Sequence, residues 1–165
     1  MDGLNLTISY NPQGSNAAEE TGYGINYTGV EGLIFWYATT DIASGTATSS
    51  GDNTAYKVSY AYGPVTVSYS DMEASVAAAS DALDGTSSSY AVSYTVSDEL
   101  SVTYGSETHD QGSTSVDMEV EGVSVAYTTG GMTITGKMQS LDNGNFATGT
   151  NNDVDYSALG ASFAF

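Results

Sequence analysis

The sequence predicts an all-β protein, an antiparallel up-and-down transmembrane β-barrel with about ten strands. Residues 1–165 form this barrel as a single domain, or they form the C-terminal portion of a larger one. Three observations support the prediction. Apolar and polar residues alternate with period two along most of the chain. Long and short connections alternate strictly between these segments. Charged residues make up only 13% of the chain, against about a quarter in soluble domains.

The alternating segments define the strands in chain order. In the first, residues 4–10, Leu, Ile and Tyr on one face alternate with Asn, Thr and Ser on the other. Residues 33–37 are apolar on both faces, and we expect Leu33, Phe35 and Tyr37 to point outward and Trp36 inward. The remaining strands are predicted at residues 23–27, 56–62, 65–69, 90–96, 100–104, 116–127, 132–138 and 159–165.

Two strands contain a break in the alternation. Val116, Met118 and Val120 are out of phase with Val123, which predicts a bulge at residues 121–122. Tyr156 is likewise out of phase with Phe163. One stretch, residues 75–83, could form a short helix.

The connections indicate how the strands are arranged. Five long polar connections alternate with four tight turns, as expected when every long loop lies on one side of a bilayer and every short turn on the other. A soluble sandwich with Greek-key crossings has no reason for this alternation. The long connections are residues 11–21, 41–53, 71–88, 106–115 and 140–155, and the turns are residues 29–32, 63–64, 98–99 and 128–131.

The tyrosines fall at two heights along the strands. Amphipathic rings favour the two membrane interfaces, so we expect an aromatic girdle at each end of the apolar band. The predicted girdle residues are Tyr10, Tyr23, Tyr27, Tyr37, Tyr56, Tyr62, Tyr69, Tyr90, Tyr94, Tyr104 and Tyr127.

The few charges within strands are candidates for the wall of a pore. Lys57 and Lys137 fall on the polar face, and Asp117, Glu119 and Glu121 alternate on the polar face of residues 116–127. Most other acidic residues are expected in the long loops, where they raise the local cation concentration and disfavour anions. A loop acidity that serves only solubility or a salty habitat is an equally open interpretation. Divalent cations could bind between loop carboxylates.

Composition excludes several classes of function. With a net charge of −18 and only two cationic side chains, the chain is unsuited to nucleic acid. It has no cysteine and no cofactor motif, and its first residues do not predict a signal peptide. We expect no cofactor, no metal site and no enzyme activity. The alternatives are an extracellular β-rich structural protein or adhesin, a soluble acidic sandwich, and an outer-membrane protease that would use the loop pair His109 and Asp110.

The chain resembles the general porins of Gram-negative bacterial outer membranes. Residues 156–165 (YSALGASFAF), 61–70 (AYGPVTVSYS) and 89–94 (SYAVSY) carry the resemblance. In that family a terminal Phe preceded by apolar residues at alternate positions is an assembly signal, which Leu159, Ala161, Phe163 and Phe165 match. The resemblance implies a trimer of 16-stranded barrels in the outer-membrane lipid, through which small hydrophilic solutes diffuse. The acidic charge adds cations to the expected solutes.

The sequence departs from this family in length and charge. It is about half as long as family members and lacks arginine, so the basic side of a family-type constriction is missing. Two interpretations follow. The chain corresponds to the last ten strands of a longer porin, or its ten strands close by pairing residues 4–10 with residues 159–165.

Overall fold

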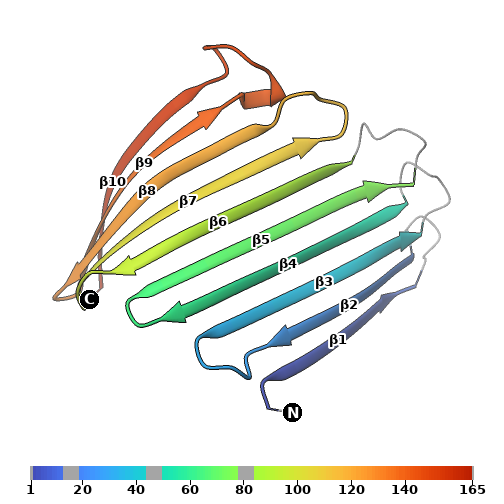
Figure 1. The fold of residues 1–165 in the computed structure, drawn as a ribbon, viewed down its shortest axis with the longest axis horizontal. Coiled ribbons are helices and arrows are strands. Elements are labelled where there is room, and N and C mark those ends of the chain that lie inside the picture. The colour runs from blue at the N-terminus through green and yellow to red at the C-terminus, as the bar shows by residue number, and fades with distance from the viewer. Residues whose placement is uncertain (1, 13–18, 44–49, 78–83, 165) are drawn as a thin grey trace.

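In a computed structural model, the chain forms ten strands joined in a single curved antiparallel sheet (Figure 1). The structure describes residues 2–12, 19–43, 50–77 and 84–164. The strands are β1 (Leu4–Asn11), β2 (Glu19–Tyr27), β3 (Leu33–Ala43), β4 (Gly51–Tyr62), β5 (Val65–Val76), β6 (Gly85–Thr95), β7 (Leu100–Gln111), β8 (Met118–Thr129), β9 (Met132–Asp142) and β10 (Val154–Phe163). The predicted number and order of strands are confirmed.

Each strand pairs with its neighbour in the sequence, so the sheet is an up-and-down meander. Its ends are β1 and β10, each paired within the described residues with one other strand. Of the two interpretations of the chain length, the one in which residues 4–10 pair with residues 159–165 is therefore wrong, and the sheet is open. Closing ten strands would leave a narrow lumen that needs bulky filling side chains, and this chain supplies mainly Gly, Ala, Ser and Thr on one face.

The pairing register gives the sheet two chemically different faces. Leu6, Ile25 and Tyr37 are successive partners on one face, which we call the apolar face. Their chain neighbours Thr7, Gly24 and Ala38 are partners on the other, which we call the polar face. Leu33, Phe35 and Tyr37 lie on the apolar face and Trp36 on the polar face, as predicted.

Neither face is covered by a second layer of protein. Among the described residues no hydrophobic side chain is buried, and Leu159 on the apolar face is 83% exposed. The predicted alternative of a soluble sandwich is wrong, because a sandwich buries one face of each sheet in a core. No helix in the described part of the chain is long and apolar enough to cross a membrane.

The strands continue further toward the long connections than predicted. β5 extends to Val76 and β7 to Gln111, so much of the predicted loops at residues 71–88 and 106–115 is strand. The same holds at residues 41–43, 51–53, 140–142 and 154–155. Hydrophobic alternation weakens at these ends because polar side chains replace apolar ones. The predicted helix at residues 75–83 is wrong at 75–76, which belong to β5; residues 78–83 lie outside the described part.

The predicted bulge in β8 is absent. Gly122 pairs with Gly105 and Glu121 with Ser106 in unbroken register. The break in the sequence pattern has another origin: toward the long connections, apolar side chains move to the polar face. Val120, Leu141 and Val154 are successive partners there. The short 3-10 turn η3 (Gly144–Phe146) lies in the connection between β9 and β10 (Figure 1).

The tight turns lie where the sequence predicts them. Gly63 opens the two-residue turn between β4 and β5 with φ 56°, and Gly130 and Gly131 form the turn between β8 and β9 with φ 55° and 83°. Positive φ at both central residues, as at Gly130 and Gly131, is the requirement of a type I′ hairpin turn. These turns all lie at one end of the sheet, and the strand ends that the long connections join lie at the other (Figure 1).

Candidate functional site: the two faces of the sheet

The polar face carries small hydroxyl side chains that bond to one another between strands. The hydroxyls of Ser70 and Ser89 are 2.8 Å apart, as are those of Ser93 and Thr103. Hydroxyls both donate and accept hydrogen bonds, so these pairs keep capacity for water or a polar solute. The polar face, which we also call the polar wall, is therefore a hydrophilic surface with short side chains.

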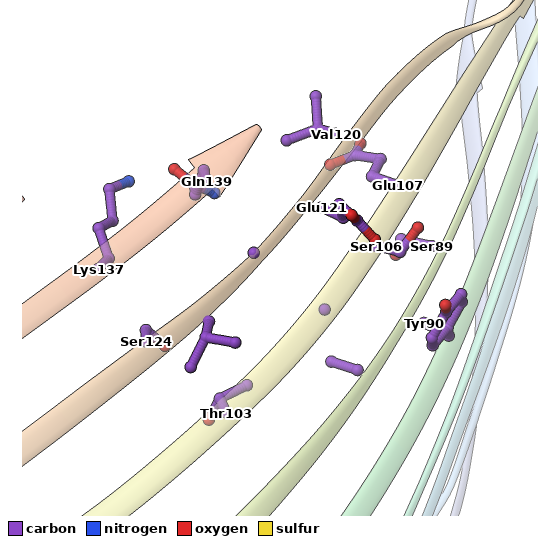
Figure 2. A pocket seen from close by; sticks show the side chains of 14 residues that line it. Ser89, Tyr90, Thr103, Ser106, Glu107, Val120, Glu121, Ser124, Lys137 and Gln139 are labelled. Atoms are coloured by element: carbon purple, nitrogen blue, oxygen red, sulfur yellow. The ribbon is translucent and has the colours of Figure 1, made fainter. Parts of the chain in front are cut away.

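A shallow hollow of about 380 Å³ lies on this wall between β6 and β9. Figure 2 shows Thr103, Ser124, Lys137 and Gln139 around it, with Glu107 toward the long-connection end. The Nζ atom of Lys137 lies 5.2 Å from the centre of the Tyr156 ring, close enough for a cation–π attraction. This contact holds the lysine against the wall.

The two lysines predicted to line a pore lie on the polar face. Lys57 pairs with Trp36 and Ser70, and Lys137 pairs with Ser124 and Ala158. All four pairing partners are uncharged, and all except Trp36 are small. Within the described strands, the polar face also carries two acidic side chains, Glu20 and Glu107, so its lysines and its carboxylates are equal in number.

The three acidic residues predicted to line a pore are placed differently. Glu119 and Glu121 lie on the apolar face, because unbroken register puts them in phase with Val123, and their predicted placement on the polar face is wrong. The Tyr104 hydroxyl donates a 2.9 Å hydrogen bond to Glu121 Oε2. Asp117 precedes β8, and its backbone carbonyl accepts a hydrogen bond from the Asn143 side chain.

Glu119 and Glu121 belong to a larger group of acidic side chains on the apolar face at the long-connection end of the strands. We call this group the carboxylate band. Apart from Glu119 and Glu121, the members of this band were expected in the long loops. That expectation is wrong, because the strands extend far enough to include them. The band consists of Glu19, Asp41, Asp52, Asp71, Glu73, Asp110, Glu119, Glu121, Asp142 and Asp155.

The predicted pair His109 and Asp110 is also in a strand rather than in a loop. Both lie in β7, on opposite faces, so their side chains point apart. His109 Nε2 instead lies 3.2 Å from Glu107 Oε1 on the polar face. The described residues contain no group of three or more His, Asp or Glu side chains placed to hold a metal ion. Divalent cations at the acidic residues remain a prediction.

The predicted girdle tyrosines share the apolar face. At the long-connection end, Tyr37 pairs with Tyr56, and the rings of Tyr56 and Tyr69 are 5.8 Å apart. The row continues from Tyr90 to Tyr104, whose rings are 6.1 Å apart. It lies next to the carboxylate band, since Tyr69 donates a 3.2 Å hydrogen bond to Asp71.

The predicted assembly-signal residues lie on the last strand. Leu159, Ala161 and Phe163 alternate along the apolar face of β10 and are paired with β9. Phe163 is 59% exposed. Phe165 lies outside the described residues.

Several residues of the polar wall were missed by sequence reasoning. Glu107, Gln139 and Ser89 line the hollow of Figure 2, yet none was singled out as pore-lining. Extending the period-two pattern beyond Tyr104 and Met138 would have placed Glu107 and Gln139 on this face.

The architecture is that of a porin-like sheet: an open up-and-down meander with one apolar and one polar face. No family model and no curated protein matches the chain. Among solved structures, the chain is similar to a porin refined at 1.8 Å resolution, with a TM-score of 0.71 and 16% sequence identity. The match covers 100% of this chain and 59% of that porin chain. The chain therefore has a porin-like fold and spans about three fifths of the porin that it resembles.

Proposed function

We propose that the chain forms part of the wall of a water-filled outer-membrane channel, through which small hydrophilic solutes and ions diffuse passively. The supporting observation is the single-layer sheet itself. An uncovered face of Val, Leu and Tyr requires an apolar surrounding, and hydrocarbon supplies one. The opposite face of Ser, Thr, Gly and Lys suits contact with water.

Small side chains on the polar face favour a wide pore. Ten strands leave an open sheet here, and a solute channel through a β-barrel usually needs more strands than that. We therefore propose that the ten strands are one part of a larger barrel. A homotrimer, as the resemblance to general porins implies, belongs to the same proposal, and chemical crosslinking of native membranes tests it.

We propose that the channel prefers cations. The net charge of −18 produces a negative potential near the pore mouth, and such a field concentrates cations. In a KCl gradient across a planar bilayer, the reversal potential is expected to have the sign of cation permeability. The potential should shrink as total salt increases, because the Debye length falls from about 10 Å at 0.1 M to about 3 Å at 1 M. An anion-selective channel would contradict the proposal.

Removing the two lysines should identify the face that lines the pore. The double substitution Lys57→Gln and Lys137→Gln is expected to raise the cation-to-anion permeability ratio about two- to fivefold, because a unit charge about 4 Å from an ion in water contributes about 1 kcal/mol. The matched control is Glu119→Gln with Glu121→Gln, which removes two charges from the apolar face and should change the ratio less. If the glutamate substitutions changed the ratio more than the lysine substitutions, the pore would be lined by the apolar face, and the proposal would be contradicted.

A further inference from the structure

A second hollow on the polar face lies at the opposite side of the sheet, over β1, β2 and β3. Its volume is about 450 Å³, within the usual range of small-molecule sites. Gly22 and Gly24 of β2 form its floor, because they have no side chains to fill the space between the side chains of β1 and β3. Trp36, the only tryptophan of the chain, lies at the short-turn end of the hollow and is 40% exposed.

The register shows how the hollow is built. Three rows of partners cross it, and each row has its middle member on β2. Amides and the indole form the first row. A hydroxyl and a methyl group flank the glycine in the second row, and two hydroxyls flank the glycine in the third. The rows are Asn5–Asn26–Trp36, Thr7–Gly24–Ala38 and Ser9–Gly22–Thr40.

The chemistry of this lining is specific. Lys57 is the partner of Trp36 on the next strand, but the lining itself carries no charged side chain. The Asn amides and the Ser and Thr hydroxyls supply both donors and acceptors. The indole supplies one flat apolar surface. An ion gains little from uncharged groups, and a purely apolar solute would leave the amides and hydroxyls unpaired.

We propose that this hollow is a binding subsite for a neutral saccharide. A sugar ring has hydroxyl groups at its rim and carbon–hydrogen bonds on its faces, so one face can stack on Trp36 while the hydroxyls bond to Asn5, Asn26 and Thr7. The inference extends the proposed channel by naming a class of solute. It rests on that channel only for the route by which the sugar arrives.

The single tryptophan provides a direct test. In detergent micelles, titrating the purified protein with sucrose is expected to shift the Trp36 emission to shorter wavelength and to saturate, because the sugar displaces water from the indole. Glycerol at the same mass concentration has hydroxyls but no ring face, and it should produce no saturable change. An unsaturable response to sucrose, or the same response to glycerol, would overturn the proposal.

Filling the hollow should abolish the response without removing the reporter. We use Gly24→Val for this purpose, since a Cβ atom at residue 24 would lie 3.6 Å from the nearest atoms, an ordinary contact. It is expected to weaken sucrose binding about tenfold or more, equivalent to about 1.4 kcal/mol. The matched control Gly136→Val, where nothing lies within 4 Å of the added Cβ, should leave binding within about twofold.

A second variant covers the case in which Gly24→Val does not fold. Asn26→Ala removes one amide and keeps the indole, and it should also weaken sucrose binding. If both variants bind sucrose like the unaltered protein, the subsite is wrong. Conductance in planar bilayers separates this failure from that of the proposed function: a protein that conducts ions but does not respond to sucrose refutes the subsite alone. A protein that binds sucrose and does not conduct refutes the channel alone.

Discussion

Val67→Lys is expected to destabilise the protein in lipid by about 2–4 kcal/mol, the value for a lysine that faces hydrocarbon near the bilayer midplane. Val67 lies on the apolar face of β5 between its partners Tyr60 and Val92. The measurement is urea-induced unfolding in phosphatidylcholine vesicles, followed by Trp36 fluorescence.

The neighbouring substitution Ser68→Lys is the matched control. Ser68 lies on the polar face between Ser59 and Ala91, and a lysine there should reach water and change the free energy of unfolding by less than about 1 kcal/mol. If Ser68→Lys were the more damaging of the two, the assignment of the faces to lipid and water would be reversed. If Val67→Lys folded in water without detergent, the membrane interpretation would fail.

Gly32→Ala is expected to cost about 2–5 kcal/mol in the free energy of unfolding. Gly32 has φ 76° in the turn between β2 and β3, and its carbonyl accepts a 2.8 Å hydrogen bond from the Ala61 amide. A Cβ atom there would overlap the Ala61 carbonyl oxygen. Left-handed strain of about 1–2 kcal/mol therefore adds to about 1–3 kcal/mol for displacing packed atoms.

Gly63→Ala separates these two contributions. Gly63 also has a positive φ, 56°, but an added Cβ would meet nothing within 4 Å. Only the strain of about 1–2 kcal/mol should remain. Equal losses for the two variants, measured by the same unfolding assay, would mean that the contact with Ala61 has no energetic weight.

The central part of each strand could be predicted from sequence, and the ends could not. Between the tyrosine rows, one face meets an apolar surrounding in the proposed channel, so the period-two pattern of residues such as Val65, Val67 and Tyr69 is clear. Beyond Tyr69 the pattern inverts: Asp71 and Glu73 continue the apolar face, while Met72 occupies the polar one. A change of phase therefore resembled a loop in β5 and a bulge in β8.

The two faces could be predicted in part. Lys57 and Lys137 lie in strand centres, where parity is reliable, and they lie on the predicted face. Glu119 and Glu121 lie beyond the inversion, where parity counted from Val120 gives the wrong face. The hollow at Trp36 depends on three strands in register, and no single stretch of sequence displays that juxtaposition.

The carboxylate band has a consequence for how deeply the proposed channel sits in a bilayer. If the protein lay deeper in the bilayer by two residues along a strand, roughly 6–7 Å, Asp71 and Glu121 would reach the depth of the tyrosines that donate hydrogen bonds to them. Hydrocarbon must therefore end below these side chains. A thicker bilayer cannot be matched by exposing more of the sheet to lipid, so the bilayer itself has to become thinner around the protein. The chain should accordingly insert more readily into short-chain lipids than into long-chain ones.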